Sequence, residues 1–176
     1  GYLYSLVTTS IIQGIKSIPV YVEADVSDGM PLFEMVGSLS PEVKESKERV
    51  RTALIKIAGY ITATKRITIN FIPANIRKTG SGFDLPVVAA VLCAIGIVPE
   101  EALKDTMVVG EISLSGDVKP VNGILPMVAE AKERGVTRCI VPAENQTEAL
   151  LVKEIEIFCG AEYCRNDTYF KRWYIH

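Results

Sequence analysis

The stretch RKTGSGFDLPVVAAVL, residues 77–92, joins a glycine-rich loop to a strongly apolar segment. Asp84 can accept hydrogen bonds from the free amides at a helix start, and Pro86 fits the first helical turn. From Val87 to Ile97 the residues are apolar on every side, which predicts a helix buried between two layers. A glycine loop before a helix is used elsewhere to hold phosphates or to present a serine nucleophile. This stretch therefore bears on both fold and function.

The segments around this helix alternate between strand and helix patterns. Strands are predicted at residues 3–9, 18–26, 32–37 and 66–74, with the third paired to the second, and a helix is predicted from Ser40 and Pro41 to Gly59. Residues 106–121 are predicted to form two strands around a tight turn at Ser115 and Gly116. Helices at 124–134 and 145–151 and strands at 138–142 and 154–159 follow. The order predicts an α/β domain of two or three layers, with a β-rich first half and parallel crossovers.

Length and composition favour one soluble domain. The 176 residues are 48% hydrophobic and 23% charged, with a net charge of −2, which sets no prior for nucleic acid or membrane. The longest apolar stretch, residues 85–98, is shorter than the ~20 residues of a membrane-spanning helix, and no secretory leader pattern opens the chain. We assign residues 1–163 to the domain. Residues 164–176, crowded with aromatic and charged side chains, are interpreted as a weakly ordered tail or a truncated linker.

The four cysteines are interpreted as reduced thiols. Cys93 and Cys139 lie in apolar runs, where a thiol packs as a small hydrophobic group. Cys159 and Cys164 lack a second pair of ligands, and His176 is the only histidine, so no metal site is expected. Reduced thiols favour a cytoplasmic location.

The glycine loop fails the test for a phosphate-binding loop. That motif needs a lysine directly after its second glycine, whereas Lys78 precedes both Gly80 and Gly82. We therefore expect no nucleotide or other cofactor site in this chain.

The residues from Lys78 to Leu92 and from Val108 to Asn145 resemble the proteolytic domain of Lon proteases. The resemblance implies a serine just after the glycine loop and a lysine in the helix after the hairpin, with the lysine acting as the base. Matching the segments places Phe83 at the serine position and Leu125 at the lysine position, so both functional positions are apolar. A displaced dyad of Ser81 and Lys132 is the alternative, but Lys132 lies two helical turns, roughly 10 Å, beyond Leu125.

Nearly all of the chain, up to Tyr163, is similar to the N-terminal domain of the magnesium chelatase-like ATPases of the ComM (YifB) family. The matching stretches are IPVYVEADVSDGMPLFEMVG, VKESKERVRTAL, KRITINFIPANIRKTGSGFDLPVVAAVL, GEISLSGDVKPVNGILPMV and IVPAENQTEAL. The resemblance implies a Lon-like fold of the ribosomal protein S5 domain 2 type. It also implies a parent protein with a hexameric AAA+ motor that uses ATP and Mg²⁺ and takes part in DNA branch migration during natural transformation. For this chain it implies a non-catalytic assembly or accessory domain.

Basic residues are concentrated in residues 41–80. This segment holds nine Lys or Arg against three Glu, whereas the remainder holds ten against eighteen acids. Lys44, Lys47 and Arg51 share one helix face, and Arg77 and Lys78 follow in the loop. These five residues are candidates for contact with DNA, a neighbouring subunit or the motor. Glutamates interleave with them, which is also typical of a solvated helix. A stand-alone nucleic-acid module and a Lon-type peptidase remain the alternative functions.

Overall fold

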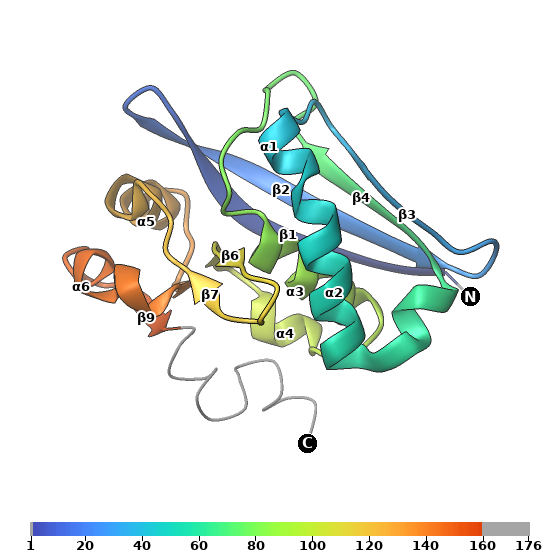
Figure 1. Cartoon of the computed structure of the whole chain (residues 1–176). Coiled ribbons are helices and arrows are strands. Elements are labelled where there is room, and N and C mark those ends of the chain that lie inside the picture. Colours follow the sequence, from blue (N-terminus) through green and yellow to red (C-terminus); the bar gives the residue numbers. More distant parts are fainter. Residues whose placement is uncertain (1, 160–176) are drawn as a thin grey trace.

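The computed structural model describes residues 2–159, and a long antiparallel hairpin forms its centre (Figure 1). Strands β1 (Tyr2–Gln13) and β2 (Lys16–Ser27) pair along their whole length, from Tyr2 with Ser27 to Gln13 with Lys16. The strand predicted at residues 18–26 is confirmed within β2, and every second side chain from residue 20, namely Val20, Val22, Ala24 and Val26, is buried. Gly14 has a φ of 65°, and a glycine at that position closes the turn without backbone strain.

The hairpin lies within a seven-stranded sheet of order β3-β4-β2-β1-β5-β8-β9. The other strands are β3 (Leu32–Val36), β4 (Arg66–Ile72), β5 (Thr106–Val108), β8 (Arg138–Val141) and β9 (Glu156–Cys159). Four pairs are parallel, namely β3 with β4, β1 with β5, β5 with β8 and β8 with β9. The predicted α/β class with parallel crossovers is confirmed.

The predicted pairing of the third strand with the second is wrong. Strand β4 lies between them, antiparallel to β2 and parallel to β3. Its inward side chains Ile67, Ile69 and Phe71 are almost completely buried, which suits a central position in the sheet. Because a helical crossover separates β3 from β4 in the chain, the two strands can lie parallel.

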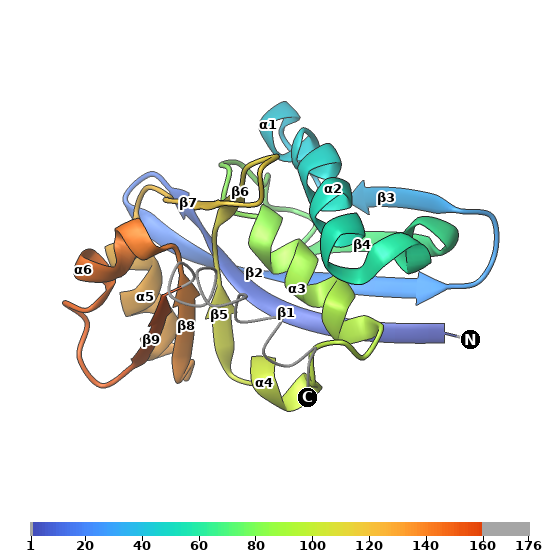
Figure 2. The same cartoon turned by 60° about the horizontal axis from the view of Figure 1, so that its bottom comes forward.

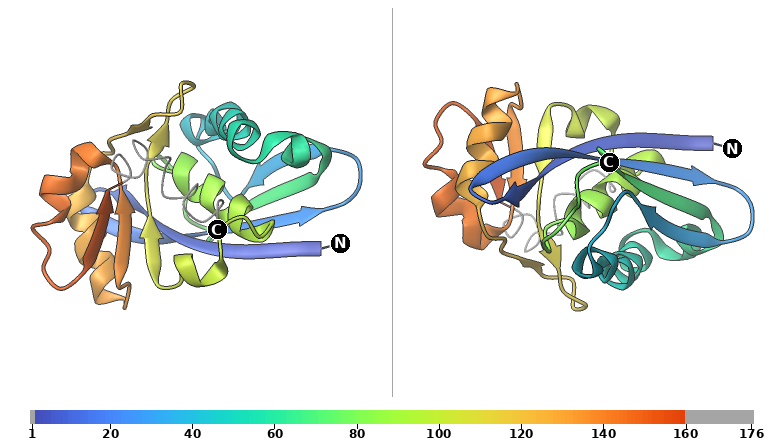
Figure 3. Two further views of the ribbon diagram at one scale, coloured as in Figure 1. Left: turned by 90° about the horizontal axis from the view of Figure 1, so that it is seen from below. Right: turned by 90° about the horizontal axis from the view of Figure 1, so that it is seen from above.

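The helices cover the sheet unequally (Figures 2 and 3). The helices are α1 (Pro41–Lys44), α2 (Ser46–Ala58), α3 (Asp84–Ala94), α4 (Glu100–Leu103), α5 (Ile124–Glu133) and α6 (Gln146–Ala149). A 3₁₀ segment, Gly59–Thr64, follows α2, and another, Ala143–Asn145, precedes α6. Helices α2 and α3 pack on one face of the sheet. Helix α5 packs on the other face, because Met107 belongs to its core cluster while the adjacent Val108 belongs to the α3 cluster. The domain therefore has three layers around β5 and β8.

Two local predictions near the central helices have clear outcomes. Ser40 begins α1 as predicted, and its hydroxyl accepts a hydrogen bond from the Val43 amide. The single helix predicted up to Gly59 is interrupted at Glu45, which separates α1 from α2. Residues 87–92 of α3 are completely buried, as the all-round apolar pattern predicted.

Residues 106–121 form three strands and not the predicted two. The first, β5, belongs to the main sheet, whereas β6 (Glu111–Ile112) and β7 (Val118–Lys119) form a separate hairpin. Gly110 lies between β5 and the β6–β7 hairpin. A Cβ at this position would lie 3.0 Å from the side chain of Val118 and 3.3 Å from that of Leu85. Within residues 2–159, none of the helices has the length and apolar character needed to cross a membrane. The predicted domain boundary at residue 163 lies outside the described residues.

Candidate functional site

A small cleft of about 180 Å³ opens beside the glycine loop. Its walls come from the end of β1 (Ser10 to Ile12), Glu42 of α1, residues Thr79 to Phe83 of the loop, and Val121, Asn122 and Met127 around the start of α5. Gly82 permits the close approach of this loop to its neighbours, because a Cβ there would lie 2.8 Å from Val109 Cγ2. The cleft therefore borders the glycine loop and the start of α5, the two segments in which the Lon resemblance implies a serine and a lysine.

The cleft offers hydroxyl groups but no basic side chain. Its polar groups are the hydroxyls of Ser10, Thr79 and Ser81, the amide of Asn122 and the carboxyl of Glu42. Among the described residues that line it there is no lysine and no histidine. A serine needs an adjacent base to become a nucleophile. The described walls therefore hold neither a lysine nor a histidine to act as the base for Ser81, and Glu42 is the one ionisable side chain among them.

The structure does not bring Ser81 and Lys132 together. Lys132, on α5, donates a hydrogen bond of 2.6 Å from its Nζ to the carbonyl of Lys153, and lies 3.8 Å from the carboxylate of Glu154. The ammonium is thus directed to the segment before β9, while Ser81 lines the cleft. The geometry gives no support to a displaced Ser–Lys dyad.

The two positions assigned to a lost dyad lie in different surroundings. Phe83 lines the cleft and is only 2% exposed, with its ring packed edge-to-face on Phe71 at a centroid distance of 5.2 Å. Leu125 is half-buried on the first turn of α5. It is Met127, not Leu125, that borders the cleft.

Lys78 does not belong to the exposed basic surface for which it was predicted. Its side chain is fully buried, and its Nζ donates hydrogen bonds to the carbonyls of Gly37, at 2.7 Å, and Pro73. Its backbone bonds to Ser38 and Ser40 on the segment after β3. Burial lowers the pKa of this ammonium below its usual range. Lys78 therefore fastens the start of the glycine loop to two neighbouring segments.

Asp84 does not cap α3 as predicted. The N-cap is Phe83, without a side-chain hydrogen bond, and Asp84 is the first helical residue. The Asp84 carboxylate instead accepts hydrogen bonds from Arg49 Nε at 2.7 Å, Arg49 Nη2 at 3.2 Å and the Ile112 amide at 2.9 Å. Burial raises the pKa of Asp84, and the bonds from Arg49 and Ile112 oppose that rise. This buried pair joins α2, α3 and the β6–β7 hairpin.

The other predicted basic residues lie on the outer side of α1, α2 and the loop. Lys44, Arg51 and Arg77 are exposed and Lys47 is half-buried. Arg51 pairs with Glu48 at 3.4 Å, one turn away on the same helix. Within the described residues, Lys44, Lys47 and Arg77 form no ion pair. We call these three residues the basic ridge.

Comparison with known proteins identifies the family. The family model described as subunit ChlI of Mg-chelatase matches residues 22–145. The chain belongs to this family. It is 36% identical to YifB of Escherichia coli over 148 residues and 33% identical to the competence protein ComM of Haemophilus influenzae over 150 residues. These matches cover 84% and 85% of this chain and 29% of each relative.

The ChlI-family domain is also similar to a protease. It is 34% identical to Lon protease 2 of Bacillus subtilis over 128 residues, which is 69% of this chain and 22% of that protein. The predicted relationship to ComM, YifB and the Lon-like domains is confirmed. The chain spans less than a third of the length of each of these relatives.

Sequence reasoning missed the role of Arg49 and a second, larger groove. Arg49 is one of several basic residues in α2. Helical periodicity places it at the boundary between the buried and exposed faces of the helix, and does not identify its partner. The groove, described below, is formed by β1, α4 and the end of α5. No motif marks these residues in the sequence.

Proposed function

We propose that this chain is the non-catalytic N-terminal assembly or accessory domain of a bacterial magnesium chelatase-like AAA+ ATPase of the ComM type. The observation that carries the proposal is the cleft beside Ser81, in a ChlI-family domain, whose described walls hold no lysine or histidine. ATP and Mg²⁺ belong to the motor of the parent protein, which acts in the cytoplasm on branched DNA during natural transformation. The similarity to ComM and YifB supports this assignment.

A peptidase assay tests the non-catalytic part of the proposal. The 176-residue chain is expected to leave an unfolded protein substrate intact. Cleavage that Ser81→Ala abolishes would establish the Lon-type peptidase and overturn the assignment. Reading the gene beyond the codon for His176 tests the other part, since an ATPase motor with a nucleotide-binding motif is expected to follow.

The basic ridge supports contact with DNA as the partner of the domain. Lys44 and Arg77 are exposed and Lys47 is half-buried, and cations of this kind bind phosphates with a strong dependence on salt. Binding of the chain to a labelled DNA duplex, followed by fluorescence anisotropy across a salt series, measures that dependence. Changing the three residues to Glu is expected to reduce the salt slope by about 3, at roughly 0.9 per phosphate contact.

Lys153→Glu is the matched control, because this lysine is exposed, as Lys44 and Arg77 are, but precedes β9, outside the ridge. It is expected to leave the slope within about 1 of the unsubstituted chain. Absence of binding at low salt would remove DNA contact. The ridge would then be assigned to the motor or to a neighbouring subunit.

A further inference from the structure

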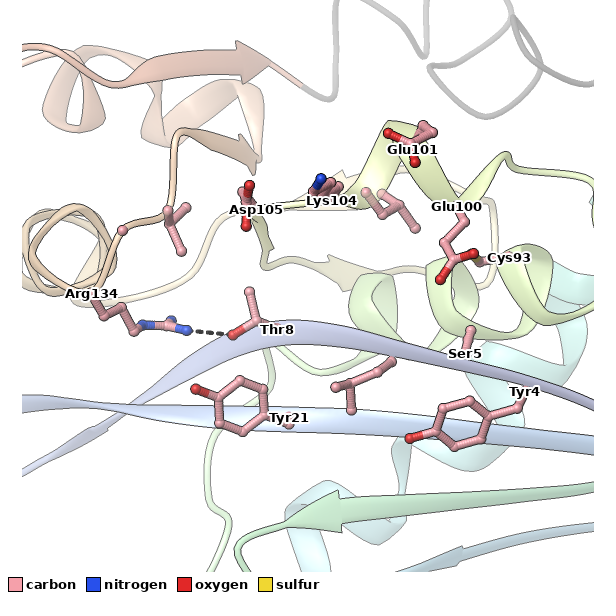
Figure 4. Close-up of a pocket in the computed structure, with 14 residues that line it drawn as sticks. Tyr4, Ser5, Thr8, Tyr21, Cys93, Glu100, Glu101, Lys104, Asp105 and Arg134 are labelled. Carbon is pink, nitrogen blue, oxygen red and sulfur yellow. Dashed lines mark hydrogen bonds between the residues drawn. The ribbon is translucent and has the colours of Figure 1, made fainter.

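A groove of about 750 Å³ runs along the first half of β1 (Figure 4). Tyr4 and Leu6 of β1 and Tyr21 of β2 line it, and all three are exposed over a third to a half of their surface. Helix α4 and the segment Gly135–Val136 complete its walls. Exposed aromatic and aliphatic side chains in a concave site are typical of the core of an interface.

The wall of the groove formed by α4 carries a small excess of negative charge. Glu100, Glu101 and Asp105 line it, and within residues 2–159 none of these carboxylates takes part in an ion pair. Two basic groups lie beside them: Lys104 lines the same wall, and Arg138 donates hydrogen bonds of 3.2 Å from its Nη2 to the carbonyls of Glu101 and Lys104.

The second base of the groove is already occupied. Arg134 donates hydrogen bonds to the hydroxyls of Thr8 and Ser10 and lies 2.9 Å from the carboxylate of Glu130. The positive charge of Arg134 is therefore balanced by the carboxylate of Glu130 on α5. The α4 wall keeps an excess of one carboxylate over the basic groups Lys104 and Arg138, and this excess can attract a cation from outside.

The turn between β1 and β2 carries the complementary groups. Ile15 is 93% exposed, and the neighbouring Lys16 is exposed and forms no ion pair within the described residues. Gln13, the last residue of β1, follows Leu6 by seven residues of strand, roughly 23 Å at ~3.3 Å per residue, and Ile15 lies in the turn beyond it. Figures 1 and 2 likewise show the turn and α4 on opposite sides of the molecule. A turn at the end of a rigid ladder cannot reach the groove of its own chain.

We propose that the β1–β2 turn of one copy docks into the groove of a second copy. Ile15 then covers Tyr4, Leu6 and Tyr21, while the Lys16 ammonium approaches Glu100 and Glu101. The contact joins two different surfaces, so it is head-to-tail, and a dimer keeps one free groove on one copy and one free turn on the other. This contact rests on the proposed function in one respect, because it is the contact through which one copy of the assembly domain binds the next copy.

Sedimentation velocity of the 176-residue chain across a concentration series tests the contact. The unsubstituted chain is expected to form dimers and larger species. Ile15→Asp and the pair Glu100→Lys with Glu101→Lys are each expected to weaken self-association by about tenfold or more, since truncation at an interface core commonly has that effect. Leu114→Asp is the matched control, because Leu114 is the exposed apolar residue at the tip of the other hairpin, and it is expected to change nothing.

Mixing the variants distinguishes a head-to-tail contact from a symmetric one. Ile15→Asp keeps an intact groove, and the Glu100→Lys/Glu101→Lys variant keeps an intact turn, so an equimolar mixture is expected to form dimers that do not grow. Combining Lys16→Glu with the two lysine substitutions in one chain is expected to restore association to within about threefold.

A chain that remains monomeric at every concentration would overturn the contact. So would association that Ile15→Asp leaves unchanged, or a mixture of variants that stays monomeric. These outcomes are independent of the proposed function, because circular dichroism reports the fold of each variant and the peptidase and DNA-binding assays do not use the turn or the groove.

Discussion

Replacing Arg49 with Met tests the buried ion pair that joins α2 to the start of α3. Both oxygens of Asp84 accept hydrogen bonds from the guanidinium, at 2.7 and 3.2 Å, and the Asp84 side chain is fully buried. Without Arg49, the Ile112 amide remains as the described donor to this carboxylate. Breaking a buried pair from one side costs about 3–5 kcal/mol, and we expect the low end, about 3 kcal/mol, because the Arg49 side chain is 21% exposed.

Urea unfolding followed by circular dichroism measures the loss, with Arg51→Met as the matched control. Arg51 lies on the same helix and also pairs with a carboxylate, but both partners are exposed and their distance is 3.4 Å. An exposed pair of this kind contributes at most about 0.5 kcal/mol. Equal losses for the two variants would refute the reasoning, because burial of Asp84 would then have no energetic consequence.

The loss in Arg49→Met is also expected to depend on pH. Burial raises the pKa of Asp84 above its ordinary 3.8, and removing Arg49 removes the main opposing contribution. A carboxyl with a raised pKa in the folded state contributes stability that is present below its unfolded pKa and lost as the pH rises through the folded pKa. The deficit of the variant is therefore expected to be small near about pH 4 and to grow toward about pH 7. A deficit that is constant across this range would show that the carboxyl does not titrate as argued.

Three other substitutions and one labelling experiment have definite expected outcomes. Phe83→Ala is expected to destabilise the chain by about 3–4 kcal/mol in urea unfolding, because it empties a buried position against Phe71, and a loss under about 1 kcal/mol would contradict this packing. Gly37→Ala is expected to cost at least about 2 kcal/mol, since its φ is 121° and the new Cβ would lie 2.4 Å from the Phe71 carbonyl oxygen. Gly14→Ala, with open space around it, is expected to cost only about 1 kcal/mol, and a larger loss there would reverse the argument. Burial raises the pKa of Cys139 to about 12, so peptide mapping is expected to find this thiol alkylated by iodoacetamide at neutral pH only after unfolding, and equal labelling of the folded chain would be inconsistent with that burial.

Much of the fold follows from patterns within a few residues. The pattern of residues 18–26 predicted a strand, the apolar run from residue 87 predicted a buried helix, and Ser40 before Pro41 predicted a helix start; all three are confirmed. Each depends on the period of a strand or helix or on a cap, which neighbouring residues determine. The strand order was not predictable in this way. Residues 32–36 have the same alternating pattern whether they pair with β2 or with β4, and the crossover through α2 decides between them.

By itself, the sequence determined the class of the domain, most of its strands and helices, and its relationship to the ComM and Lon-like proteins. Only the tertiary structure decided which charges are buried: Arg77 is exposed while the adjacent Lys78 is enclosed, and Arg49 turns to a carboxylate 35 residues later in the chain. The physical reason is that periodicity depends on near neighbours along the chain. The surroundings of one charged group depend on carbonyls and carboxylates that distant segments bring to it.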